Sequence, residues 1–92
     1  MKNNIYIITY DLTNPGRNYE ELLKILKTQG KWARLGGSSY LVACDSTVIQ
    51  LRDNLKVALD INDKIYVSLL SSPAAWYGLS QDVANWILDN QK

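Results

Sequence analysis

Strand-type and helix-type hydrophobic patterns alternate along the chain in a single order, and this order restricts the possible fold more than any other feature. We expect strands in the runs where β-branched and aromatic residues dominate, namely 4–10, 31–35, 38–44 and 64–70. Apolar residues recur with the period of a helix over 19–28, and again from a cap at Asp45, Ser46 or Thr47 to an end near Asp60. The predicted order is therefore βαββαβ.

Short turn signals separate these elements. Asn14-Pro15-Gly16 is expected to turn the chain after the first strand, and Asn18 with Glu21 resembles a capping box before the first helix. Gly30 fits the C-terminal stop of that helix, where a glycine with positive φ is common. Gly36-Gly37 suits a two-residue hairpin turn between the second and third strands. The hairpin is the clearest of these signals.

The predicted order also decides how the sheet is covered. Helices that connect parallel strands cross the sheet on the same side, so both main helices should lie on one face, as in the ferredoxin-like α+β sandwich. Along the first strand, Ile5, Ile7 and Thr9 share a face with Asp11, and Tyr6, Ile8 and Tyr10 share the other. We expect the tyrosine-bearing set, with Tyr66 or Ile65, to form the face without helices. That face is too apolar to stay exposed, so a terminal helix, a second protomer or stacked bases should cover it.

A further helix is predicted after the fourth strand. Ser80, with Asp82 in the first turn, opens a helix that carries Val83, Trp86 and Ile87 on one side. Trp76, Tyr77, Trp86 and Ile87 are expected to lock this helix onto the domain. We treat residues 1–92 as one ferredoxin-like domain, with the βαββαβ core over 4–71 and the C-terminal connection and helix over 73–92.

Composition narrows the class of protein. The absence of histidine excludes a histidine general base, a Ser-His-Asp triad and any His-ligated zinc site. The single cysteine, Cys44, is expected to be a small buried hydrophobe at a strand end, and no run of 18 apolar residues is present. We therefore predict a cytoplasmic protein with no membrane partner. A core this small would gain from oligomerisation, which favours a homodimer.

The charge distribution indicates only a mild preference for anions. Ten basic and nine acidic residues leave a net charge of +1. The chain as a whole therefore lacks the large positive charge that is typical of nucleic-acid-binding domains. Between Arg17 and Arg34, however, five basic residues face only two acids. This basic flank is either a solvated helix face or a surface that contacts phosphates.

Asp11 is the candidate site residue. It follows the apolar first strand directly and is the only acid before residue 20. A carboxylate at a strand end can bind Mg²⁺, or it can form an Asx-turn with the backbone near Leu12-Thr13. No second acid has an obvious route to Asp11 within one chain. Metal-dependent chemistry would therefore need a second Asp11 across a dimer axis.

Exposed aromatic residues on such a sheet would also suit base stacking, as in RNA-recognition motifs. The third strand does not carry that pattern, because Gly37 to Val42 lacks the required basic residue and paired aromatics. Core or interface roles are therefore expected for Tyr6, Tyr10, Tyr40 and Trp32.

Several segments together resemble a known family. The strand Ile7 to Leu12, the hairpin from Gly30–Leu35 to Ser39–Val42 and the second helix are similar to the Cas-two-like family of small CRISPR-associated proteins. They look closer still to its stand-alone SinR-family branch, where a Tyr-Asp-Leu strand end, an Asn-Pro-Gly turn and a terminal segment like Trp76 to Trp86 recur. The resemblance implies a ferredoxin-like homodimer. In the CRISPR members it also implies a strand-end aspartate, matched here by Asp11, that is implicated in metal-dependent phosphodiester cleavage.

Two functions follow from these observations. The near-neutral charge favours a non-catalytic homodimeric module that binds nucleic acid or protein. The alternative is a Mg²⁺-dependent endonuclease for RNA or DNA, in which Asp11 residues from two protomers hold one metal ion. Arg17, Lys31 and Arg34 are the candidate nucleic-acid contacts.

Overall fold

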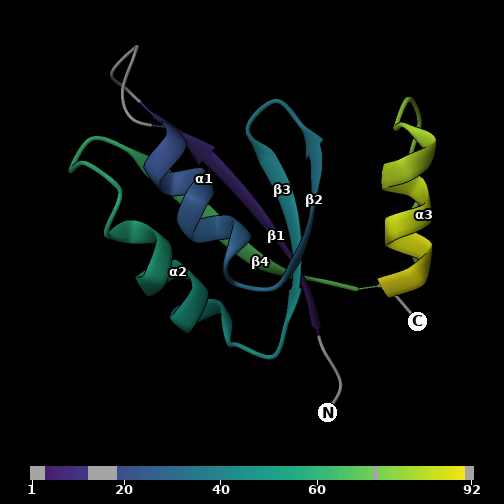
Figure 1. The fold of residues 1–92 in the computed structure, drawn as a ribbon, viewed down its shortest axis with the longest axis horizontal. Helices are drawn as coiled ribbons and strands as arrows, with labels where there is room; N and C mark the ends of the chain where they lie inside the picture. The colour runs from purple at the N-terminus through teal and green to yellow at the C-terminus, as the bar shows by residue number, and fades with distance from the viewer. Residues whose placement is uncertain (1–3, 13–18, 72, 91–92) are drawn as a thin grey trace.

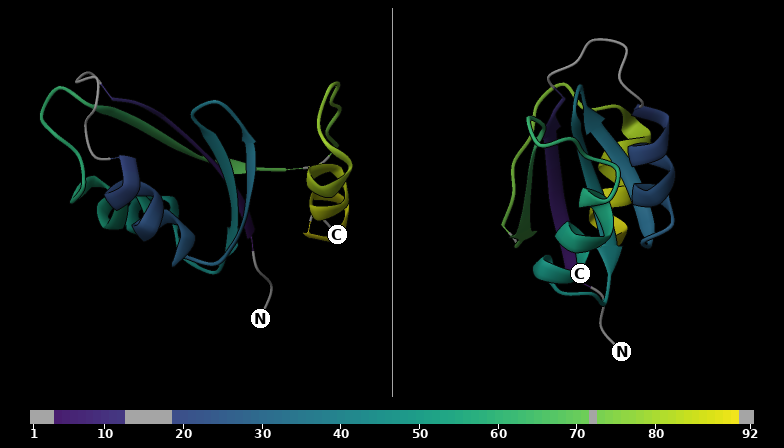
Figure 2. Two further views of the ribbon diagram at one scale, coloured as in Figure 1. Left: turned by 45° about the horizontal axis from the view of Figure 1, so that its top comes forward. Right: turned by 90° about the vertical axis from the view of Figure 1, so that its left-hand side faces the viewer.

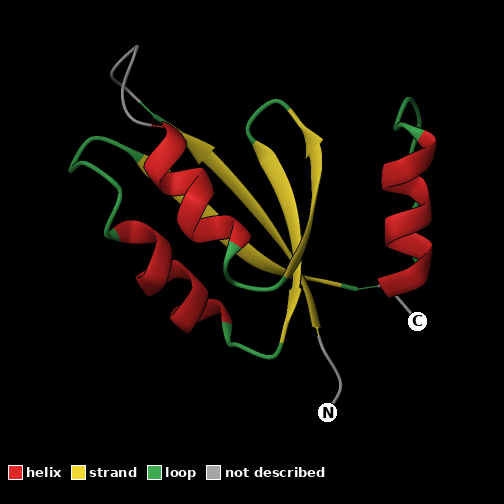
Figure 3. Ribbon diagram, in the orientation of Figure 1, coloured by secondary structure: helices red, strands yellow, loops and turns green. Residues whose placement is uncertain are grey.

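The computed structural model describes residues 4–12, 19–71 and 73–90 (Figure 1). Its elements are β1 (Asn4–Asp11), α1 (Tyr19–Lys27), β2 (Lys31–Gly36), β3 (Ser39–Cys44), α2 (Val48–Lys56), β4 (Lys64–Leu70) and α3 (Gln81–Asn90). The predicted order and terminal helix are confirmed, as the colouring by secondary structure in Figure 3 shows. The turn predicted at Asn14-Pro15-Gly16 and the cap at Asn18 lie outside the described residues.

The four strands form one antiparallel sheet in the order β2-β3-β1-β4. β1 lies inside the sheet between β3 and β4, as its nearly continuous apolar run predicts. Helices α1 and α2 lie on one side of the sheet and α3 on the other (Figure 2). This arrangement is the ferredoxin-like α+β fold with an additional helix. It leaves β2 and β4 as the two outer strands.

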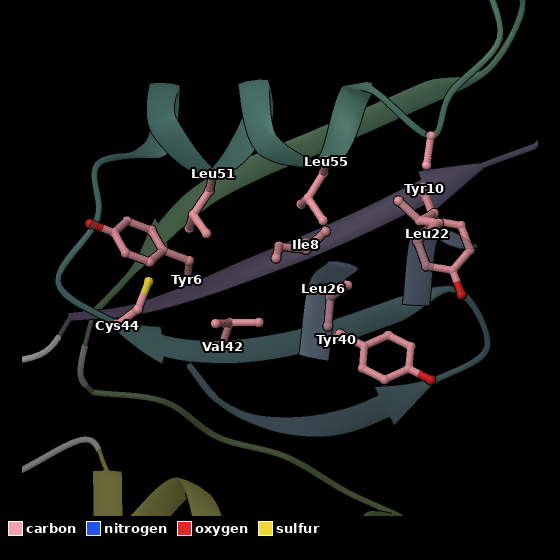
Figure 4. Close-up of a cluster of buried hydrophobic side chains, with 11 residues drawn as sticks. Tyr6, Ile8, Tyr10, Leu22, Leu26, Tyr40, Val42, Cys44, Leu51 and Leu55 are labelled. Carbon is pink, nitrogen blue, oxygen red and sulfur yellow. The ribbon is translucent and has the colours of Figure 1, made fainter. Parts of the chain in front are cut away.

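The main core lies between the sheet and helices α1 and α2. Tyr6, Ile8 and Tyr10 of β1 point into it and pack with the buried leucines of both helices, Leu22, Leu26, Leu51 and Leu55 (Figure 4). The prediction that the tyrosine-bearing face is the one without helices is therefore wrong. The Tyr6 hydroxyl donates a hydrogen bond of 2.5 Å to the carbonyl oxygen of Ser46, just before α2. This bond satisfies the polar end of the ring beneath the helices. Cys44 is buried on the same side, as predicted.

Helix α3 covers part of the opposite face. Its Ile87 is buried against Ile5, Leu41 and Ala43, and Val83 and Trp86 pack around them, which confirms the predicted apolar side of this helix. The N–H of Val83 donates a hydrogen bond of 3.3 Å to Ser80 Oγ, as a cap requires. Trp76 and Tyr77, in contrast, are 40% and 100% exposed, so the prediction that they lock the helix is wrong.

Local hydrogen bonds explain where the second helix begins. Of the three predicted caps, Thr47 is the one used, because its Oγ1 accepts from the N–H of Gln50 at 3.1 Å. The Gln50 side chain accepts in turn from the N–H of Thr47 at 2.9 Å, which completes a capping box. The helix ends at Lys56 and not near Asp60 as predicted, since Val57 is its C-cap.

Two glycines fulfil roles that differ from the predicted ones. The hairpin turn lies one residue later than expected, because Gly36 is still paired with Ser39 and the chain turns at Gly37 and Ser38. Gly30 does not adopt positive φ. It lies so close to β3 that a Cβ at this position would overlap the Ala43 carbonyl oxygen. Close approach to the sheet, and not a left-handed helix cap, is therefore the reason for a glycine after α1.

Candidate functional site

Asp11 lies at the exposed end of β1, on the face of the sheet that α1 and α2 leave open. In the β1–β4 ladder it is directly opposite Lys64, and the next pair along this face is Thr9 with Tyr66. These residues, with Tyr10 and Ile65, line a hollow of about 170 Å³. The predicted Asx-turn would involve Thr13, which is outside the described residues.

Lys64 is the cross-strand neighbour of Asp11 in this hollow. Residues directly opposite each other in an antiparallel ladder have Cβ atoms about 4.5–5.5 Å apart, so a change of rotamer can bring the Lys64 ammonium to the Asp11 carboxylate. An ammonium there competes with a divalent cation for the carboxylate. Across residues 4–12, 19–71 and 73–90, no three acidic or cysteine side chains gather closely enough to hold a metal ion. The hollow in a single chain therefore offers one carboxylate, that of Asp11, with Lys64 opposite it in the ladder.

The predicted nucleic-acid contacts do not form one surface. Lys31 is opposite Ala43 in the β2–β3 ladder and so lies on the α3 side of the sheet, whereas Arg34 is opposite Tyr40 and lies on the α1–α2 side. The Arg34 guanidinium donates a hydrogen bond of 3.2 Å to the Gly37 carbonyl oxygen. Arg17 lies outside the described residues. The structure therefore divides the predicted basic flank between two faces.

A different group of side chains comes together at β2. The Lys27 ammonium lies 4.5 Å from the ring centroid of Trp32, which in turn lies 6.0 Å from the Tyr40 ring at an interplanar angle of 50°. Tyr40 is buried, as are Tyr6 and Tyr10, which confirms their predicted core role. Trp32 remains 40% exposed at the edge of the sheet. Sequence reasoning missed the Lys27–Trp32 contact because the two residues belong to different elements.

The outer edge of β4 is the other prominent surface. β4 has a strand neighbour on one side only, and Lys64 is its only charged residue. Tyr66 and Leu69 are 63% and 55% exposed on this strand. Beside them a hollow of about 230 Å³ opens between α2 and β4, lined by Val48, Ile49, Arg52, Ile65, Tyr66 and Val67. The edge thus combines free backbone groups with exposed apolar side chains.

Comparison with known proteins supports the fold and leaves the function open. No protein-family model and no curated protein matches this chain. Among solved structures, it is similar to a hypothetical protein, TT1823, from Thermus thermophilus, with a TM-score of 0.66 and 22% sequence identity. The similarity covers 84% of this chain and 93% of that protein. None of the described helices has the length and apolar character needed to cross a membrane.

Proposed function

We propose that this chain is a small homodimeric binding module of the Cas-two-like type, which binds nucleic acid or protein without catalysing a reaction. The observation that carries the proposal is the free edge of β4 with its exposed apolar side chains. Natural sheet proteins usually protect such an edge with charges, proline or a covering segment. Residues 65–70 contain neither a charge nor a proline, so this edge is suited to pair with another strand.

A second copy of the same chain fits this edge well. Two β4 strands that pair antiparallel across a twofold axis at Val67 would join the two four-stranded sheets into one. In this register, Leu69 of each copy lies opposite Ile65 of the other on the α2 side. Tyr66 of each copy then lies opposite Ser68 of the other on the open side. The pairing satisfies backbone groups and buries exposed apolar area at once.

Leu69→Lys is expected to weaken the dimer by at least about tenfold in dissociation constant, equivalent to about 1.4 kcal/mol. The reason is that a lysine at this place must bury its charge against Ile65 of the other copy or forgo the contact. Light scattering coupled to size-exclusion chromatography, over a range of concentrations, measures the change. Leu88→Lys is the matched control, because Leu88 is 59% exposed on α3, close to the 55% of Leu69. A monomeric wild type, or equal effects of both variants, would contradict the β4 dimer.

A second candidate function is a Mg²⁺-dependent endonuclease that cleaves RNA or DNA with Asp11 from two protomers. Its support is the exposed position of Asp11 at the strand end, where a ligand can reach the carboxylate. The facing Lys64 opposes it. The β4 dimer opposes it too, since Asp11 pairs with Lys64 at the strand end, away from an axis at Val67. At about 3.3 Å per residue and 4.8 Å per strand, two Asp11 residues would be more than about 20 Å apart. They could not share an ion.

Asp11→Asn separates the two functions. We expect the wild type and this variant to be equally inactive towards single-stranded and duplex RNA and DNA in the presence of Mg²⁺ or Mn²⁺, and equally dimeric. Asp82→Asn, a change at an exposed acid on α3, is the control for loss of one negative charge. Metal-dependent cleavage by the wild type that Asp11→Asn abolishes and Asp82→Asn retains would establish the endonuclease and overturn the proposed module.

A further inference from the structure

The basic residues of this chain are strongly segregated. Residues 22–44 contain Lys24, Lys27, Lys31 and Arg34 and no aspartate or glutamate. The remainder holds all nine acidic residues and only six basic ones, so a net charge of +1 conceals a basic region and an acidic remainder. In the fold, this region comprises most of α1, the outer strand β2 and β3. A local positive field therefore exists at the β2 edge of the sheet.

Three of these basic side chains, together with Trp32, belong to the side of the sheet where α1 lies. Lys24 and Lys27 are three residues apart on α1, so they share one side of the helix. The Lys27 ammonium reaches Trp32, and Arg34 follows Trp32 on the same face of β2. Both lysines and Arg34 are exposed, and Trp32 is 40% exposed. We call Lys24, Lys27, Trp32 and Arg34 the α1–β2 basic surface.

The acidic residues of α3 do not neutralise this surface. Asp82 and Asp89 belong to a helix that packs on the opposite face of the sheet, where Ile87 contacts Ile5 and Leu41. Lys31 lies on that face as well and is therefore excluded from the surface. Glu20, four residues before Lys24, is the acid that shares this side of α1, so the surface combines three cations and one acid with a 40% exposed indole that Lys27 contacts. This is the chemistry with which proteins bind single strands, because cations attract phosphates while an aromatic ring stacks on a base.

We propose that the α1–β2 basic surface binds single-stranded nucleic acid, with Lys24, Lys27 and Arg34 contacting phosphates and Trp32 stacking on a base. This inference rests on the proposed binding module and gives it a partner and a surface. The cation–π contact between Lys27 and Trp32 is weaker than base stacking and forms on a flexible side chain. When a nucleic-acid strand binds, the Lys27 ammonium can therefore move to a phosphate, and a base can stack on the indole in its place.

Fluorescence anisotropy with end-labelled oligo-dT and oligo-rU tests the proposal. We expect the logarithm of the association constant to fall with the logarithm of salt concentration with a slope of about −2, from three phosphate contacts at about 0.7 each. Lys27→Ala should reduce that slope by about 0.7. Trp32→Leu should weaken binding by roughly 5- to 100-fold and leave the slope unchanged, because stacking releases no counterions. Binding of either oligonucleotide in this pattern supports the proposal.

Two matched controls are available in the same chain. Trp76→Leu replaces another indole that is 40% exposed, and Lys56→Ala replaces the last residue of α2, just as Lys27 is the last residue of α1. Both variants should bind like the wild type, and circular dichroism confirms that each variant is folded. The surface lysines provide a readout even if Trp32→Leu proves unstable, because their side chains are exposed.

Several outcomes would overturn the assignment. The first is that the protein binds neither oligonucleotide at low salt. The second is that the control variants lose as much affinity as Trp32→Leu and Lys27→Ala. The others are equal affinity for an abasic oligomer of the same length, and affinity for duplex nucleic acid equal to that for single-stranded nucleic acid. Light scattering on the same samples keeps the two proposals apart. A dimer that binds no oligonucleotide overturns this inference and leaves the homodimer intact. A monomer that binds through Trp32 supports this inference and contradicts the homodimer.

Discussion

Gly30→Ala is expected to lower the free energy of unfolding by about 3 kcal/mol, the upper end of the usual cost of overpacking. The new methyl group would overlap the Ala43 carbonyl oxygen and lie 3.0 Å from the Cβ of Cys44. The Ala43 backbone has little room to move, since Ala43 pairs with Ile5 on one side and Lys31 on the other. Relief would require separating α1 and β2 from the sheet. Urea denaturation followed by circular dichroism measures the change.

Gly37→Ala provides the comparison. Gly37 has a φ of +48° and nothing within 4 Å of its would-be Cβ, so an alanine there meets backbone strain alone, about 1–2 kcal/mol. Equal losses of unfolding free energy in the two variants would mean that close approach to β3 is not the reason for a glycine at position 30. Gly30 also joins α1 to β2, so its variant should disturb the Lys27–Trp32 contact, whereas Gly37→Ala should leave it unchanged.

The order of elements was predictable because hydrophobic periodicity and turn chemistry are local properties. The strand limits at Lys31, Cys44, Lys64 and Leu70 follow from such signals, and the structure confirms them. Which face of β1 lies under the helices was not predictable from that strand. Both faces are apolar, since Ile5 and Ile7 alternate with Tyr6 and Ile8. A central strand that is covered on both sides has no polar face, so its sequence does not indicate which face lies under the helices.

The candidate site was predictable only in part, for a related reason. Asp11 at the strand end is a local feature, but the facing Lys64 depends on a strand more than fifty residues later. The ferredoxin-like order would have predicted this Asp11–Lys64 pairing, because that order places the end of β1 opposite the start of β4. Lys31 and Arg34 are both predicted nucleic-acid contacts, but residues three apart on a strand face opposite sides of the sheet. The basic flank itself was predictable from the sequence, because the two acids between Arg17 and Arg34 both precede residue 22 and none follows before residue 45.

Ile87→Ala is expected to lower the free energy of unfolding by about 3 kcal/mol, within the usual range for a large-to-small change at a buried site. Ile87 is 4% exposed and is the residue of α3 that reaches the buried cluster of Ile5, Leu41 and Ala43. Leu88→Ala, at an adjacent side chain that is 59% exposed, should change stability by less than about 0.5 kcal/mol. Chemical denaturation of both variants measures the difference.

The same pair tests what covers the open face of the sheet. If α3 is the cover, Ile87→Ala should also increase binding of a hydrophobic dye, because a loosened helix exposes Leu41 and Ile5. Dimerisation should be retained at concentrations where the protein is folded, since the β4 edge belongs to the other half of the sheet from β2, which α3 contacts. Equal, small effects of Ile87→Ala and Leu88→Ala would show that α3 contributes little as a cover. The apolar face would then be free for a second copy, and the dimer would have to be sought on that face instead of at the β4 edge.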